Sequence, residues 1–399
     1  LSTPPLACVK GAGVNFELND EQLAFAQLAR DFARQDLAPF AAQWDAESIF
    51  PIDAFRKGGQ LGFCGLYSPE AQGGLGLSRL DSALVFEELA AADPSTAAFF
   101  TIHNMATWML CTWGQPALQA EWGERLTSGE QLASYCLTEP DAGSDAANLK
   151  TSARRDGDDY VLNGSKMFIS GAGSTDMLVV MVRTGVAGAK GISAIAVPAN
   201  LPGIRYGKKE EKMGWNSQPT RAIFFDDVRV PVANRLGEEG EGFRIAMKGL
   251  DGGRINIATC SVGAAQGALN AAQAYLGERK QFGKALAEFQ ALQFRLADMV
   301  TELVAARQMI RLAASKLDAG HRDASTYCAM AKRFATDAGF NVCNEALQLH
   351  GGYGYLRDYP LERLLRDARV HQILEGTNEI MRVIIARRML EADAPESIR

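Results

Sequence analysis

Apolar residues recur with the period of an amphipathic helix through the first third of the chain. Asn19 can cap a helix, and Phe25 and Phe32 fall on one face of the segment that follows it. The same pattern continues to about residue 130, broken by the turn-like stretch SPEAQGGLGLS. We therefore expect an irregular segment over residues 1–15 and an α-helical domain over residues 16–132.

The pattern changes to short β-rich runs over residues 133–245. The runs DYVLNG, MLVVMVR, ISAIAVP and RAIFFDDVRV are separated by turn dipeptides such as Asp156-Gly157 and Asn163-Gly164. The helices that a doubly wound parallel sheet needs do not occur between these runs. The middle of the chain is therefore predicted to be an antiparallel β domain.

The helical period returns after Gly253 and holds almost to the end of the chain. Long helices are expected over residues 254–277, 286–318 and 323–349, and their alanine-rich faces indicate close helix packing. A helical bundle is therefore expected over residues 246–399. The order of the three domains is α, then β, then α.

Composition and charge exclude several classes of function. The 399 residues suffice for two or three domains, and the net charge of −6 argues against nucleic acid as the main partner. No run approaches the roughly 18 apolar residues of a membrane-spanning helix, and the first residues lack the pattern of a secretory signal. The seven cysteines, Cys8 among them, are scattered, and neither they nor the four histidines have metal-ligand spacing. We therefore expect reduced thiols and no metal site.

Two glycine-rich stretches fail the requirements of nucleotide-binding motifs. Gly11-Ala-Gly13 lacks the third glycine of a Rossmann fingerprint, and GVAGAKG at residues 185–191 lacks the P-loop spacing. Both are typical of turns.

Three other stretches have the chemistry to hold a flat polar ligand, and each also has a simpler interpretation. YCLTEPDAGSD, residues 135–145, ends a strand in a loop rich in hydroxyl and N–H groups, although a capped turn would look the same. Phe168-Ile169-Ser170 sets an aromatic ring beside a hydroxyl, although phenylalanine more often fills a core. The two cations of Arg279-Lys280 end a helix, where the helix dipole alone favours them.

A carboxylate near the end of the chain stands in an unusual setting. In RVHQILEGTNEIMR, Glu375 follows an apolar run and precedes Gly376 and Thr377. Glutamate is rarely buried without a partner. Composition alone leaves two interpretations open, a residue at a helix end and a group that moves a proton.

Five stretches together resemble the acyl-CoA dehydrogenase family: YCLTEPDAGSD, GSKMFISGAGS, ERKQFGKALAEFQ, QLHGGYGY and RDARVHQILEGTNEIMR. They follow the order of the family and cover the chain from about residue 19 to its end. The resemblance implies a helical N-terminal domain, a middle antiparallel β-barrel domain and a C-terminal four-helix bundle, assembled as a homotetramer. It also implies FAD as cofactor, an acyl-CoA substrate and an electron-transfer flavoprotein as partner.

The resemblance also implies roles for individual residues, although many relatives have tryptophan at the position of Phe168. The loop at 135–144 and the segment at 168–170 would line the flavin, and Arg279 with its neighbours would reach the diphosphate, partly across a subunit interface. The implied FAD contacts are Tyr135, Leu137, Thr138, Gly143, Ser144, Phe168, Ile169, Ser170, Arg279, Gln281, Phe282, Phe289, Gln290, Gln348, Leu349, Gly351, Gly352, Thr377, Asn378 and Glu379. The implied substrate contacts are Ser144, Asp251, Arg254, Gly376 and Arg387.

The family resemblance makes Glu375 the catalytic base. The family's carboxylate stands directly before a Gly-Thr or Gly-Ser pair, as Glu375 does here. Burial should raise the pKa of such a carboxylate toward the working pH. Some members place the base on a helix instead, at the position occupied here by Gly253, which cannot serve.

Finer features point to a short branched substrate. TIHNMATW, GWNSQPTRAIFF, GGRINIATCS and HGGYGYLRDY resemble members that oxidise isobutyryl-CoA to methacrylyl-CoA in valine breakdown. The alternatives are 2-methylbutyryl-CoA, butyryl-CoA, an acyl-CoA oxidase and a non-catalytic flavin- or CoA-binding protein. The expected compartment is the cytoplasm of a bacterium, or the mitochondrial matrix of a eukaryote.

Overall fold

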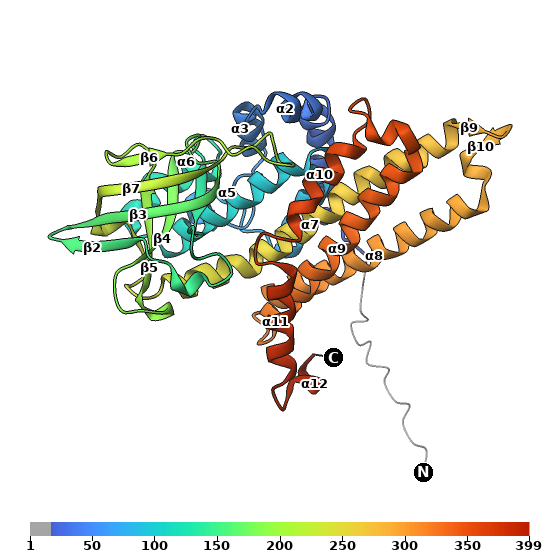
Figure 1. Cartoon of the computed structure of the whole chain (residues 1–399). Helices are drawn as coiled ribbons and strands as arrows, with labels where there is room; N and C mark the ends of the chain where they lie inside the picture. Colours follow the sequence, from blue (N-terminus) through green and yellow to red (C-terminus); the bar gives the residue numbers. More distant parts are fainter. Residues whose placement is uncertain (1–16, 399) are drawn as a thin grey trace, which may run out of the picture.

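The computed structural model describes residues 17–398; the irregular segment expected over residues 1–15, with Cys8, lies outside the described residues. The N-terminal part is helical, as predicted (Figure 1). Its first helix starts with a capping box, because Asn19 and Gln22 each accept a hydrogen bond from the other's backbone N–H. The helices are α1 (Asp20–Phe32) with the π-helical turn η1 (Ala33–Leu37), α2 (Ala41–Glu47), α3 (Ile52–Gln60), α4 (Arg79–Ala92), α5 (Pro94–Trp113) and α6 (Pro116–Thr127).

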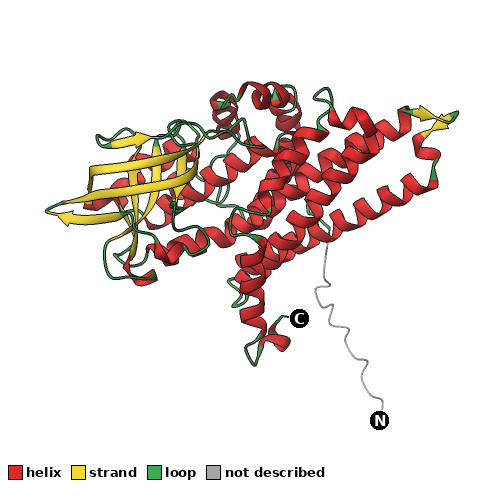
Figure 2. Ribbon diagram, in the orientation of Figure 1, coloured by secondary structure: helices red, strands yellow, loops and turns green. Residues whose placement is uncertain are grey.

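A single eight-stranded sheet forms the middle of the chain (Figure 2). Its strands are β1 (Ala133–Cys136), β2 (Ser152–Asp156), β3 (Asp159–Ser170), β4 (Met177–Arg183), β5 (Ile192–Pro198), β6 (Ile204–Tyr206), β7 (Thr220–Pro231) and β8 (Arg235–Leu236). The four β-rich runs seen in the sequence are confirmed as β3, β4, β5 and β7. The strand order is β6-β7-β3-β2-β4-β5-β8, with β1 paired to β4.

The sheet is mixed, which corrects the expectation of purely antiparallel pairing. Both β1 and β2 run parallel to β4, whereas the other pairings are antiparallel. The reason is the long loop at residues 137–151, which carries the chain back before β2 begins, so that β1 and β2 run in the same direction. That loop contains most of YCLTEPDAGSD.

Strand β4 is apolar on both faces because both faces are covered. Met177 and Val179 pack into the core formed with α5, α6 and α7, whereas Leu178 and Val180 pack into the core formed with β3 and β7. The sheet therefore curves around one core, and helices pack against its outer face. This explains why the run MLVVMVR shows no alternation of apolar and polar residues.

The C-terminal part is a bundle of α7 (Gly242–Glu278), α8 (Gln290–Asp318), α9 (Ala324–His350) and α10 (Leu361–His371). Helix α7 runs from the sheet into the bundle and also packs on α4 and α5, so it contacts all three parts of the chain (Figure 1). The hairpin of β9 (Lys280–Gln281) and β10 (Lys284–Ala285) lies at the end of the bundle farthest from the sheet (Figure 1). Helices α11 (Asn378–Met389) and α12 (Ala394–Ser397) follow. The short 3-10 turns are η2 (Glu70–Gln72), η3 (Ala146–Asn148), η4 (Ala189–Gly191), η5 (Val232–Asn234), η6 (Leu286–Glu288) and η7 (Gly351–Tyr355).

The three-domain order is confirmed, while the residue boundaries between the domains stay a prediction. Helix α7 begins at Gly242, before the expected start of the third domain at residue 246. Among residues 17–398, no helix has the length and apolar character needed to cross a membrane.

Buried ion pairs and hydrogen bonds attach α10 to the rest of the molecule. Arg363 of α10 lies 2.9 Å from Asp93, the capping residue of α5, and both side chains are buried. One turn further, Asp367 accepts a hydrogen bond of 2.6 Å from the backbone N–H of Trp215 in the loop before β7. Because α10 leads directly to Glu375, these contacts set the position of the candidate base.

We predict that Arg363→Met destabilises the folded protein by about 3 kcal/mol, because it leaves the Asp93 carboxylate buried without its cation. Urea unfolding followed by circular dichroism measures the change. The matched control is Arg229→Met, which breaks exposed pairs with Asp156 and Asp159 and should cost less than about 1 kcal/mol. Equal losses in the two variants would show that the Arg363 pair does not hold α10.

Candidate active site

Glu375 lies in the turn between α10 and α11 and faces α7. Its backbone φ is +56° and that of Gly376 is +85°, so both residues are in the left-handed region. A Cβ atom on Gly253 of α7 would lie 2.4 Å from Oε2 of Glu375. Glycine at position 253 cannot itself serve as a base. Because it lacks a side chain, it also leaves the space that the carboxyl group of Glu375 occupies.

The environment of Glu375 favours its neutral form. The Oε2 atom is shielded from solvent and has no hydrogen-bond partner among residues 17–398, although the residue as a whole keeps some exposed surface. Burial raises the pKa of Glu375 to about 7, while the charges of Arg254 and Lys332 act in the opposite direction. A carboxyl group with a pKa near the working pH can act as a general base.

Two other polar atoms of the predicted site are also buried without a hydrogen-bond partner in the described part of the chain. They are Oη of Tyr135 at the end of β1 and Nε of Arg254 on α7. Burial, together with the nearby carboxylate of Glu375, raises the pKa of Tyr135 well above its usual value. Buried polar groups are normally hydrogen-bonded, so a group of unpaired ones marks a place that a ligand completes.

A bulky wall stands beside this position on α7. The guanidinium of Arg79 lies over the ring of Tyr67, 3.5 Å from its centroid, and 4.8 Å from that of Trp108. Its Nη1 atom has no hydrogen-bond partner and lies 2.4 Å from where a Cβ of Gly252 would be. The wall therefore limits the space next to Gly253 and Glu375.

The predicted substrate residues on α7 form one cluster. Arg254 is buried and lies 2.6 Å from Asp251, whose carboxylate also accepts a hydrogen bond of 2.8 Å from Ser325 of α9. Arg254 is close enough to lower the pKa of Glu375. The other two predicted substrate residues outside the turn, Ser144 and Arg387, are exposed.

A buried ion pair supports the loop that follows β1. Lys166 of β3 donates to the carboxylate of Glu139 at 2.8 Å and to the carbonyl of Leu137 at 3.0 Å. The Glu139 carboxylate also accepts from the backbone N–H groups of Lys150 and Thr151. Leu137 and Glu139 are thus buried, while Gly143 and Ser144 of the same loop are exposed to solvent.

The segment at residues 168–170 presents an aromatic surface. Phe168 is 63% exposed and has a φ of +59°, whereas the next residue, Ile169, is buried. The backbone N–H of Met167 donates to the carbonyl of Thr138, so this segment lies beside the loop after β1. An exposed aromatic ring beside this loop suits the face of a flat heterocycle.

A second group of predicted cofactor residues lies far from the first. Arg279, Gln281 and Phe282 belong to the β9–β10 hairpin region, at the end of the bundle opposite the sheet (Figure 1). Phe282 is 94% exposed. The others of this group are Phe289, Gln290, Gln348, Leu349, Gly351 and Gly352, of which Leu349 is buried. One copy of the chain does not bring the two groups together.

The three predicted cofactor residues after Gly376 have different surroundings. Thr377 caps α11 by accepting from the backbone N–H of Ile380, and Glu379 is exposed. Asn378 is buried, and its amide donates to Thr336 and Asp337 of α9. Its side chain is thus used to hold the turn, because a buried amide needs partners for both its donor and acceptor atoms.

Sequence reasoning missed Arg79, Tyr67 and Lys332. A signal was available for Lys332, because it falls on the buried face of a helix rich in alanine, one turn from Cys328 and Thr336. No such signal marks Arg79, which opens a helix in sequence and meets α7 only after folding.

Family comparisons agree with this geometry over nearly the whole chain. The family model for the acyl-CoA dehydrogenase N-terminal domain matches residues 19–130, that for the middle domain residues 134–228, and that for the C-terminal domain residues 240–390. The chain belongs to the acyl-CoA dehydrogenase family. It is therefore an FAD-dependent oxidoreductase, as the members of this family are.

Individual relatives match over almost their full length. The chain is 54% identical to isobutyryl-CoA dehydrogenase, mitochondrial, of Bos taurus, over 94% of this chain and 90% of the relative. It is 53% identical to the protein of that name from Dictyostelium discoideum, over 94% and 91%. A chain in the solved structure of the electron transferring flavoprotein of Acidaminococcus fermentans superposes with a TM-score of 0.92, at 41% identity, over 94% of this chain and all of that one.

We predict that Glu375→Gln is more stable than the wild type at pH 8. The folded protein holds this carboxyl with a pKa of about 7, against an ordinary value of 4.5, so the wild type loses about 1–3 kcal/mol of stability as the pH rises from about 4.5 to 7, and the loss remains at pH 8. Glutamine has no such charge. The midpoint of thermal unfolding, measured from pH 5 to pH 8, should separate the two proteins as the pH rises, whereas a constant difference would contradict the burial of the charge.

Proposed function

We propose that this chain oxidises isobutyryl-CoA to methacrylyl-CoA. The observation that carries the proposal is the carboxyl group of Glu375: its Oε2 is shielded from solvent without a hydrogen-bond partner among residues 17–398, its pKa is raised to about 7, and it lies against Gly253. The acyl group is proposed from the two isobutyryl-CoA dehydrogenases at 53–54% identity. The residue roles and domain boundaries expected from the sequence are kept as part of this proposal.

In the proposed reaction, Glu375 accepts the proton of the thioester α-carbon. The positive charge of Arg254 favours the ionised base, and the left-handed Gly376 lets the backbone approach the thioester, so that the N–H of Glu375 can donate to its oxygen. Asp251, Arg254 and Arg387 would bind the CoA part. When bound, FAD accepts the hydride that leaves the β-carbon.

FAD would be held by two sets of residues from different copies of the chain. The aromatic face of Phe168 and the loop at 137–144 suit the flavin ring, while Arg279 suits a diphosphate and Phe282 offers an exposed aromatic surface. The hairpin region of Arg279 and Phe282 lies at the end of the bundle farthest from the sheet (Figure 1), whereas the first set lies beside β1 and the end of β3. This separation supports the homotetramer expected from the sequence, in which one copy completes the site of another.

The wall formed by Tyr67, Arg79 and Trp108 supports a short acyl group. These large side chains occupy the space beside Gly252 and would stop a long straight chain from passing the base. Pocket packing of this kind distinguishes chains that differ by one methylene by about 1–3 kcal/mol. For the choice between isobutyryl-CoA, 2-methylbutyryl-CoA and butyryl-CoA, this packing argument is weaker support than the sequence identity to the relatives.

The electron acceptor is proposed to be an electron-transfer flavoprotein, as the structural relative's description suggests. An oxidase that passes electrons to dioxygen is the alternative of another class. Anaerobic titration with isobutyryl-CoA tests both, because substrate should bleach the yellow protein and air should restore the colour slowly. Rapid recovery of colour in air would favour the oxidase, and no bleaching by any short acyl-CoA would refute the proposed function.

We predict that Glu375→Gln binds FAD and isobutyryl-CoA normally but loses at least about 10⁴-fold in kcat, because glutamine cannot accept the α-proton. In the wild type, kcat/KM should rise with pH to a plateau above about 7, as Glu375 loses its proton. Steady-state assays with an artificial acceptor from pH 5.5 to 9 measure both. Substantial activity in the variant would contradict the role of Glu375.

We predict that Arg79→Leu raises kcat/KM for hexanoyl-CoA relative to isobutyryl-CoA by about tenfold, because it shortens the wall beside Gly252. Arg56→Leu is the matched control, since Arg56 is exposed in α3 and pairs weakly with Asp53. An unchanged ratio in Arg79→Leu, with normal FAD content, would show that this wall does not set chain length.

A further inference from the structure

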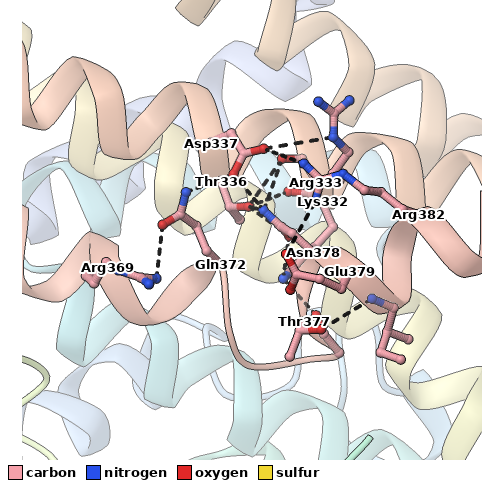
Figure 3. A network of polar contacts seen from close by, with 12 residues as sticks. Lys332, Arg333, Thr336, Asp337, Arg369, Gln372, Thr377, Asn378, Glu379 and Arg382 are labelled. Carbon is pink, nitrogen blue, oxygen red and sulfur yellow. Dashed lines mark hydrogen bonds and ion pairs between the residues drawn. The ribbon is translucent and has the colours of Figure 1, made fainter.

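A buried lysine contacts the turn that carries the base. Lys332 of α9 has no exposed surface, and its Nζ donates to the carbonyl of Gly376 at 2.8 Å and to Oδ1 of Asn378 at 2.9 Å (Figure 3). Gly376 directly follows Glu375. Lysine is almost never fully buried unless it is paired, so its presence here needs a reason.

No carboxylate forms an ion pair with Lys332 within residues 17–398. Burial lowers the pKa of Lys332 to about 8, and among the charges that oppose this effect Glu375 is the largest, followed by Asp337 and Glu379. In return, Lys332 acts against the burial that raises the pKa of Glu375. The lysine and the base are therefore coupled through space without touching.

The rest of the turn is tied to the same helix. The Asn378 amide donates to Thr336 at 2.9 Å and to Asp337 at 2.8 Å, and Asp337 also accepts a bond of 2.8 Å from Gln372 (Figure 3). The backbone N–H of Asn378 donates to the carbonyl of Gln372. Both ends of the turn are thus held by Asp337, and its middle by Lys332.

This support matters because the backbone of Glu375 is strained. A non-glycine residue in the left-handed region persists where its surroundings over-determine it. The Gly376 carbonyl follows two successive left-handed residues, Glu375 and Gly376, so its position depends on the conformation of both. A donor fixed on α9 therefore selects the conformation in which the carboxylate faces Gly253.

We propose that Lys332 is a positioning residue for the reaction: its ammonium group fixes the Glu375–Gly376 turn through the Gly376 carbonyl, and its charge keeps the base ionised. This inference rests on the proposed function for its kinetic consequence. Its structural consequence, the order of the turn, can be tested on the folded protein without turnover.

Several other groups face the base and bear on its ionisation. Arg254 of α7 also favours the ionised form, and Tyr135 of β1 and Tyr67 stay neutral at physiological pH. His371 at the end of α10 is neutral as well, because burial lowers its pKa to about 3. Lys332 is thus one of two cations acting on Glu375, and the one that also contacts its turn.

Two variants separate the charge of Lys332 from its hydrogen bonds. Lys332→Met removes both, whereas Lys332→Gln removes the charge and keeps an amide donor. We expect Lys332→Met to lower kcat for isobutyryl-CoA about 100-fold and to move the acid limb of the pH profile upward by about one pH unit. Lys332→Gln should show the same shift of the limb with a smaller loss of kcat.

Hydrogen–deuterium exchange gives the readout that does not depend on activity. In the FAD-loaded protein, amides of residues 373–378 should exchange faster in Lys332→Met and close to the wild-type rate in Lys332→Gln. The control is Arg295→Met on the neighbouring helix α8, whose side chain is 47% exposed and pairs with Glu345, and this variant should change neither the exchange nor the pH profile.

The outcomes distinguish this inference from the proposed function. An unchanged acid limb and unchanged exchange in a folded Lys332→Met variant would overturn the role of Lys332. If Lys332→Met fails to fold, the pH profile and the exchange of Lys332→Gln test the role of Lys332 instead. The shift of the acid limb in Lys332→Gln depends on the loss of charge alone. A wild type that oxidises no acyl-CoA would refute the proposed function, and the exchange data would still test the hold on the turn.

Discussion

The site depends on one physical constraint. The Oε2 atom of Glu375, shielded from solvent, lies against the backbone of α7. Oε2 of Glu375 occupies the space where a side chain at Gly253 would lie. This contact requires glycine on α7, a left-handed backbone at Glu375 and a turn held rigidly behind it. Each requirement costs stability, and a protein keeps such costs where chemistry needs them.

The buried charges of the molecule fall into two kinds. Arg363 with Asp93 and Lys166 with Glu139 are fully paired, and each fixes an element next to the site, α10 in one case and the loop after β1 in the other. Lys332 and Glu375, by contrast, form no ion pair within residues 17–398, and Lys332 donates to neutral oxygens of Gly376 and Asn378. The paired charges fix the scaffold, whereas unpaired buried groups of this kind have shifted pKa values.

Two exposed aromatic rings bear on the assembly of the protein. Phe168 beside the sheet and Phe282 at the far hairpin each leave an aromatic ring in solvent. A large exposed aromatic ring lowers solubility unless something covers it. A cofactor shared between copies of the chain would cover both rings and would couple assembly of the protein to completion of its site.

Sequence by itself determined the order of the domains and the four main strands, because these depend on local periodicity, while the short motifs around Glu375 led to its prediction as the base. It did not determine the parallel pairing of β1 and β2 with β4, the burial of the Asn378 side chain, or the contacts of Lys332 and Arg79 near the site. Those features join residues far apart in the chain, such as Lys332 with Gly376 and Arg79 with Gly252. Only tertiary packing brings such groups within hydrogen-bond distance, so no local pattern records them.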